Sequence, residues 1–257
     1  MQNGTFHYSF HGGLEISRRQ VRRLRHENVV GTTFVVNSGA QHDIGPKTNF
    51  KGVVADTVTL NATDVNDAAG GTGVQLVLLE GLDAAGLEIT EEVAPGAVST
   101  QTFLAVNRMT VVALGSNGKQ HGYITAQTTT LGDMMNRLDT DTTLGGAANG
   151  YNVSSGCYWQ VPADCNGYIT QWSMGVIEIP TGTFTGYITG ALWIKDPDTG
   201  IWVGRDVQGC TSFGPNSYKT FDPPLIVKPL SIIKIRARST VANSGLQGDF
   251  SLILEDI

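Results

Sequence analysis

Along most of this chain, apolar residues recur at every second position or in short runs, and Gly, Asn and Asp bound each run. In residues 230–238, for example, Ile233 and Ile235 alternate with Lys234 and Arg236. A period of two is the spacing of a β-strand with one buried face. Only 16% of the residues are charged, which is low for a chain built from exposed helices. The pattern therefore predicts an all-β protein of many short strands.

The strands that this pattern predicts fall into two groups. In the first half they are 32–37, 53–60, 74–80, 87–93, 98–104, 106–114 and 121–127. In the second half they are 157–161, 167–175, 185–195, 201–206, 219–221, 225–227, 230–238 and 248–255. Short strands at this spacing are typical of a β-sandwich, so we expect one jelly-roll-like β-sandwich in each half.

The composition divides the chain into four segments. We expect a basic N-terminal arm at 1–30, a first β-sandwich at 31–130, a linker at 131–149 and a second β-sandwich at 150–257. The linker includes the run Gly145-Gly146-Ala147-Ala148, although residues 133–138 could form a single helical turn.

The two halves also repeat one order of features: a turn with Asp early and Gly late, then an aromatic residue, then a long strand. These features are 83–86, Phe103 and 106–114 in the first half, and 196–200, Phe221 and 230–238 in the second. The sequence therefore suggests a duplication.

The arm concentrates positive charge on an acidic protein. Five of the 17 basic residues lie within eight positions, and the net charge of the whole chain is −6. These five are Arg18, Arg19, Arg22, Arg23 and Arg25. Ser17 and Gln20 have the spacing of a capping box, which predicts a helix of about ten residues. The run fits a solvated helix, a docking segment for an acidic protein partner, or a DNA contact; docking is the interpretation we favour, because DNA would be repelled by the rest of the chain.

Motifs for catalysis or metal binding are missing from the sequence. It contains no G-x-S-x-G, P-loop or H-E-x-x-H pattern, and the histidines lack metal-ligand spacing. Glu91 and Glu92 are adjacent in a predicted strand, so they point to opposite faces and cannot act on one bond. The Gly-rich stretch 70–73 fits a loop between strands. We therefore expect no enzyme activity, no catalytic residue, no metal site and no cofactor.

Two weaker possibilities concern cysteine and calcium. Cys157, Cys165 and Cys210 are an odd number without paired spacing, so we expect reduced thiols rather than a disulfide framework. Asp196 and Asp198 lie in a predicted turn and could contribute to a calcium site, although they supply too few ligands for a complete one.

All four tryptophans lie in the second half, and two of them are candidate contact residues. Trp193 and Trp202 could stack on a glycan or take part in a subunit interface. Leu192 and Ile194 would occupy the face opposite Trp193, so its strand is apolar on both faces. We favour packing or an interface for Trp193 over glycan binding.

Several segments resemble virion structural proteins of tailed bacteriophages, notably phages of marine bacteria and cyanobacteria. In the first half they are 69–93 (AGGTGVQLVLLEGLDAAGLEITEEV), 103–112 (FLAVNRMTVV) and 115–118 (GSNG). In the second half they are 161–172 (VPADCNGYITQW) and 250–255 (FSLILE). The resemblance implies a structural role in the virion and supplies no catalytic residues. The Arg-rich arm is a departure from the family pattern.

Together these observations predict a non-enzymatic structural component of a tailed bacteriophage virion. The favoured placement is a capsid-exterior decoration or cement protein, anchored through its arm. The alternatives are a tail adaptor- or fibre-associated protein, or a host-surface glycan-binding module. The expected partners are the major capsid protein or tail proteins and further copies of the chain, for which we suggest a trimer. We expect assembly in the host bacterial cytoplasm, with no membrane segment and no direct nucleic-acid contact.

Overall fold

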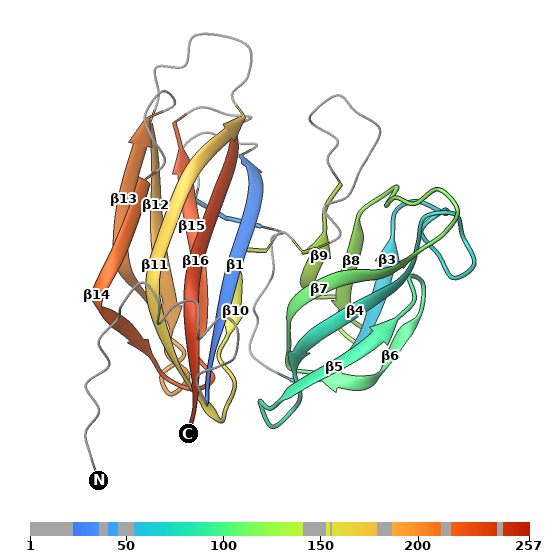
Figure 1. The fold of residues 1–257 in the computed structure, drawn as a ribbon, viewed down its shortest axis with the longest axis horizontal. Coiled ribbons are helices and arrows are strands. Elements are labelled where there is room, and N and C mark those ends of the chain that lie inside the picture. The colour runs from blue at the N-terminus through green and yellow to red at the C-terminus, as the bar shows by residue number, and fades with distance from the viewer. Residues whose placement is uncertain are drawn as a thin grey trace.

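The computed structural model describes residues 23–35, 41–45, 54–140, 153–154, 156–178, 187–211, 217–240 and 244–257. In these ranges every regular element is a β-strand, and the strands form two antiparallel β-sandwiches side by side (Figure 1). The predicted all-β fold with two sandwiches is confirmed. The described residues include no helix that is long and apolar enough to cross a membrane.

The first sandwich is built from a single stretch of chain. Its strands are β3 (Asp56–Ala62), β4 (Val74–Leu82), β5 (Glu88–Val93), β6 (Val98–Phe103), β7 (Ala105–Leu114), β8 (Ile124–Thr128) and β9 (Met134–Leu138). One sheet has the order β6-β3-β8-β9 and the other has the order β5-β4-β7. Alternate side chains such as Val58, Leu60, Val77 and Leu79 are fully buried between the two sheets.

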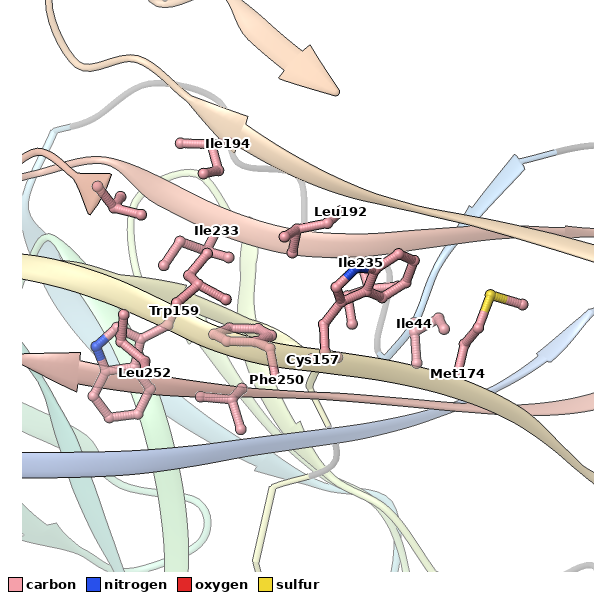
Figure 2. Close-up of a cluster of buried hydrophobic side chains, with 14 of the residues drawn as sticks. Ile44, Cys157, Trp159, Met174, Leu192, Ile194, Ile233, Ile235, Phe250 and Leu252 are labelled. Atoms are coloured by element: carbon pink, nitrogen blue, oxygen red, sulfur yellow. The ribbon is translucent and has the colours of Figure 1, made fainter. Parts of the chain in front are cut away.

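The second sandwich combines both ends of the chain. Its strands are β1 (Leu24–Val35), β2 (Gln41–Asp43), β10 (Tyr158–Gln160), β11 (Cys165–Glu178), β12 (Tyr187–Lys195), β13 (Trp202–Thr211), β14 (Ser217–Val227), β15 (Ile232–Ser239) and β16 (Ser244–Asp256). One sheet has the order β1-β16-β11-β14, the other has the order β10-β15-β12-β13, and β2 pairs with β15. Figure 2 shows part of the core, where Ile233 and Ile235 point inward as their alternation predicts.

The N-terminal strand differs most from the sequence prediction. All twelve residues of β1 pair with β16, so the expected boundary between residues 30 and 31 falls inside a strand of the second sandwich. The first sandwich is therefore inserted between β2 and β10. The helix predicted after Ser17 does not extend through residues 24–26, which are strand; residues 17–22 lie outside the described ranges. Pairing with β16 supplies backbone hydrogen bonds and buries Val29 in the core.

The helical turn suggested at 133–138 is wrong. Residues 134–138 form β9, which pairs with β8 and completes a sheet of the first sandwich, although the sequence places them in a linker. The strand is fixed by burial: Leu138 is fully buried, and the side chain of Asn136 donates a hydrogen bond to the carbonyl of Val106 at 3.1 Å.

The strand order confirms the repeated plan. Strands β3 to β8 form the orders β5-β4-β7 and β6-β3-β8, and β11 to β16 form the orders β13-β12-β15 and β14-β11-β16. Each strand of the first series thus has a counterpart eight strands later with the same neighbours. The fourth strand of one sheet differs in origin, because β9 follows β8 along the chain whereas β1 reaches β16 from the N-terminus.

The two predicted hairpin turns show why Asp comes early and Gly late. The Asp83 carboxylate accepts hydrogen bonds from the backbone N–H groups of Ala85 (2.8 Å) and Leu87 (2.9 Å). Asp196 does the same for Asp198 and Thr199, both at 3.0 Å. Each turn ends at a glycine with positive φ, 80° at Gly86 and 69° at Gly200, where a side chain would be strained.

Candidate functional site

The contact between the two sandwiches is held by buried polar groups. The side chain of Asn107 in β7 donates to the carbonyl of Gln160 and accepts from its backbone N–H, both at 2.9 Å. The Tyr158 hydroxyl donates to the backbone carbonyl of Val106 in the first sandwich. The turn after Asp83 contributes as well, because the carbonyl of Gly86 accepts from the N–H of Ala163 at 2.8 Å. These paired groups fix the relative position of the sandwiches without leaving their buried donors unsatisfied.

Charged residues of β1 strengthen the same contact. Glu27 forms an ion pair with Arg108 of the first sandwich at 2.9 Å, and the Arg108 guanidinium lies 5.3 Å from the ring centroid of Trp159. Arg25 forms an ion pair with Glu88 of β5. Burial, the largest single influence, lowers the pKa of Arg25, but the hydrogen bond that Arg25 donates to Glu88 and the negative charges around it together raise the pKa overall. β1 is therefore a strand of the second sandwich, and its charged side chains also form ion pairs with the first.

This arrangement divides the five arginines of the predicted docking arm. Arg25 is part-buried in the intramolecular pair with Glu88, so it holds the sandwiches together. Arg23 is exposed, and its carbonyl accepts from the N–H of Asp256 at 3.0 Å. Arg18, Arg19 and Arg22 lie outside the described residues. The role of Arg25 could not be recognised from the sequence, because its partner lies 63 positions away.

Trp193 and Trp202 gather on the outer face of the β12–β13–β15 sheet. Register places Trp193 opposite Lys234 of β15 and Gly204 of β13, and Trp202 opposite Lys195. The ammonium group of Lys234 lies 4.3 Å from the ring centroid of Trp202 and 3.1 Å from the Asp43 carboxylate. Burial lowers the pKa of Lys234, and Asp43 opposes this shift. Lys234 thus covers a face of the Trp202 ring that a sugar would need for stacking.

Trp193 is half-buried on this outer face. Its ring lies over Gly204, where a β-carbon would be 3.8 Å from the ring, an ordinary contact distance, and its indole nitrogen is shielded from solvent. On the opposite face, Leu192 and Ile194 enter the core as the alternation predicts. The packing role of Trp193 stays a prediction, and the following variant tests it.

Trp193→Ala is expected to lower the free energy of unfolding by about 2–4 kcal/mol, because a half-buried ring leaves a void above Gly204. Tyr187→Ala is the matched control: Tyr187 is 61% exposed on the same strand, and its loss should cost under about 0.5 kcal/mol. Urea unfolding followed by circular dichroism measures both. A Trp193→Ala chain of unchanged stability that no longer binds host cells would support the glycan-binding alternative.

In the turn considered for calcium, the two carboxylates are paired with a lysine side chain. The ammonium group of Lys228 lies 2.9 Å from the Asp198 carboxylate and 3.4 Å from that of Asp196. Hydrogen bonds to these two carboxylates raise the pKa of Lys228. In the described ranges, His, Cys, Asp and Glu side chains do not gather in threes in a way that could hold a metal ion.

Glu91 and the three cysteines are the other candidate residues that the sequence raises, and the structure describes all four. Glu91 accepts from the backbone N–H groups of Thr100 (2.7 Å) and Gln101 (2.9 Å) and so joins β5 to β6. Burial would raise the pKa of Glu91, but these hydrogen bonds lower it overall. All three cysteines are free thiols, and burial raises the pKa of Cys165 to about 12, so this sulfur is a poor nucleophile at neutral pH.

A buried carboxylate that the sequence does not reveal organises the Gly-rich loop. Asp67 is 1% exposed and accepts from the backbone N–H groups of Val74 (2.8 Å), His121 (3.0 Å) and Gly122 (2.6 Å). A β-carbon at Gly73 would lie 2.2 Å from the Asp67 carboxylate, so glycine is required there. The 70–73 stretch is a loop between β3 and β4, as predicted.

Comparison with known proteins gives no family. No protein-family model matches the chain, and no curated protein matches it either. Among solved structures, the VP2 subviral particle of infectious bursal disease virus is 11% identical over 91% of this chain and 71% of that chain, with a TM-score of 0.23. The T=1 particles derived from the same virus are 10% identical over 91% and 73%, with a TM-score of 0.21. Similarity at this level carries no argument about function, and the fold rests on the chain's own strand pairing.

Proposed function

We propose that this chain is a non-enzymatic structural component of a tailed bacteriophage virion, placed as a decoration or cement protein on the capsid exterior. The observation that carries the proposal is that polar side chains in the segments resembling such proteins have structural roles. Asp83 shapes a hairpin turn, Glu91 joins two strands, and Asn107 and Arg108 hold the two sandwiches together. These four polar side chains maintain the shape of the two sandwiches, which is what a particle component requires.

The arm supplies the proposed anchor. Arg25 is used within the chain, so Arg18, Arg19, Arg22 and the exposed Arg23 remain as the residues that would bind an acidic surface of the major capsid protein. The rest of the chain is acidic, which favours a protein partner over nucleic acid for these arginines. The protein would then assemble onto the particle in the host bacterial cytoplasm and remain in the virion.

Quantitative mass spectrometry of purified particles tests both the role and the placement. Hundreds of copies of the chain per particle are expected for capsid decoration, whereas about a dozen would indicate the tail or a vertex. Absence of the chain from washed particles would contradict a virion role altogether.

A triple variant tests the anchor. Arg18→Gln, Arg19→Gln and Arg22→Gln together should leave the melting temperature unchanged, while the copy number falls at least about tenfold, because several charge contacts are lost at once. Arg205→Gln is the matched control, since Arg205 is exposed on β13, far along the chain from the arm. Normal incorporation of the triple variant would rule out anchoring by the arm.

A further inference from the structure

The outer face of the β12–β15 pair carries a stripe of positive charge. Along β15, basic residues alternate with buried ones, and Lys195 of β12 lies on the same outer face because its neighbour Ile194 enters the core. Register places Lys195 opposite Ile232, so four cations follow one another at two-residue intervals. At about 3.3 Å per residue, they extend over about 20 Å. This cationic stripe consists of Lys195, Lys234, Arg236 and Arg238.

A single carboxylate neutralises part of the cationic stripe. Asp43 lies 3.1 Å from the Lys234 ammonium and 3.0 Å from the Arg236 guanidinium, and the described strands of this sheet place no other carboxylate on the face. Lys195 and Arg238 form no ion pair with a described residue. Burial is the largest influence that lowers the pKa of Lys234, and the charges of Arg236 and Lys195 add to it. Four cations against one carboxylate leave an excess of three positive charges.

The first sandwich shows that the fold does not require such a stripe. β4, β5 and β7 occupy the positions that β12, β13 and β15 occupy in the second sandwich. Their one basic residue is Arg108, which is paired with Glu27 at 2.9 Å and with Glu80 at 4.0 Å. Positive charge that is concentrated and uncompensated costs a folded chain self-repulsion. Its presence on one of two equivalent sheets therefore indicates a binding surface.

Solvent reaches three of the four cations. Arg238 is exposed, and Lys195 and Arg236 are partly exposed, so their charged groups are available to a partner. The Lys234 side chain is only 12% exposed, because it lies between the Trp202 ring and Asp43, and it contributes its charge from below.

An acidic segment of a protein fits the cationic stripe better than other anions do. Side chains on one face of an extended peptide recur every two residues, which is the spacing of the stripe. A nucleic acid or an acidic polysaccharide continues beyond the stripe with closely spaced charge, and the rest of this chain, with a net charge of −6, would repel it. A sugar is not favoured either, since Lys234 covers the Trp202 ring.

We propose that the outer face of β12 and β15 binds an extended, acidic segment of a protein partner along the cationic stripe. This surface is additional to the arm that serves as the proposed anchor. It does not depend on the virion role, because it concerns the isolated chain and a peptide.

Carbodiimide coupling of a glutamate peptide to the full-length chain tests the proposal, because the reaction joins a lysine amine to a carboxylate held beside it. The arginines of the arm do not react, and the chain has no lysine before residue 47. At low salt, the peptide should couple to Lys195 at least about fivefold more than to Lys119, a partly exposed lysine before β8. Mass spectrometry locates the coupled lysines, and about 0.5 M salt should remove the preference.

Arg238→Glu tests whether the peptide lies along the whole stripe. Arg238 is about 20 Å from Lys195, so it cannot act on that amine directly. Repulsion in place of attraction at this end should lower coupling at Lys195 at least about threefold. Lys119→Glu is the matched control and should leave coupling at Lys195 unchanged, as should Arg238→Lys, which keeps the charge.

Thermal melts establish that each variant is folded, and Arg238→Gln provides the same test if Arg238→Glu does not fold. Equal coupling at Lys195 and Lys119, or unchanged coupling at Lys195 in the Arg238→Glu chain, would overturn the proposal. A short thymidine oligonucleotide that displaces the peptide at a lower concentration than free glutamate peptide does would also overturn it, because the surface would then fit nucleic acid.

Discussion

A chain that lacks residues 1–28 is expected to lose its folded second sandwich, whereas a chain that lacks residues 1–22 should keep both sandwiches. The longer deletion removes five residue pairs between β1 and β16, from Leu24 with Glu255 to Asn28 with Ser251. An antiparallel ladder holds about one hydrogen bond per pair, so the loss is about 3–7 kcal/mol. That is comparable with the whole stability of many domains, about 5–15 kcal/mol.

The deletion also removes two ion pairs between the sandwiches, Arg25 with Glu88 and Glu27 with Arg108. Without Arg25 and Glu27, Glu88 loses its ion pair and Arg108 loses one of its two, although Arg108 keeps Glu80 at 4.0 Å and its contact with Trp159. The double variant Arg25→Gln and Glu27→Gln separates the two effects, because it removes both ion pairs and leaves the ladder intact. Circular dichroism and urea unfolding compare the three chains. If the chain without residues 1–28 melts at the full-length temperature, β1 contributes little to the fold.

The same strand shows where prediction from sequence reaches its limit. Alternation in 230–238 is unambiguous because apolar residues fill one face, and the structure buries that face as expected. In β1, the positions on the inner face include Arg25 and Glu27, so the segment has the composition of an exposed arm. Those charges can be buried only because Glu88 and Arg108 arrive from the other sandwich. Contacts between residues so far apart in sequence leave no local pattern.

The residues of the candidate site likewise fall into two classes, those that a local sequence pattern predicts and those that depend on distant segments. Turn residues such as Asp83 and Gly86 follow from local backbone geometry, and they lie where the sequence predicts. The repeat of features also predicts the shared strand order. Contacts that need two distant segments are not predictable in this way; they include Lys234 on Trp202 and Asn107 on Gln160. The pairing pattern of β13 and β14 belongs to this second class, since an edge strand and a central strand can have similar sequences.

Asp67→Ala is expected to destabilise the first sandwich by about 3–6 kcal/mol, because it leaves one buried and two part-buried backbone donors without an acceptor at about 1–3 kcal/mol each. The donors are the N–H groups of Val74, His121 and Gly122, which come from the start of β4 and from the segment that leads into β8. The carboxylate therefore joins two segments more than 40 residues apart.

Asp67→Asn separates the charge from the shape. An asparagine side chain fits the same space but places an NH₂ group against the N–H of either Gly122 or Val74, so one donor still faces a donor. We therefore expect Asp67→Asn to lose a large part of the stability that Asp67→Ala loses. Asp83→Ala is the matched control, because its carboxylate also accepts two backbone N–H groups, but in a solvated turn where water can replace it; it should cost about 1 kcal/mol. Urea unfolding of the three variants measures the differences. If Asp67→Ala and Asp83→Ala unfold at the same urea concentration, burial of the Asp67 bonds adds nothing, and the Gly-rich loop is held by its backbone alone.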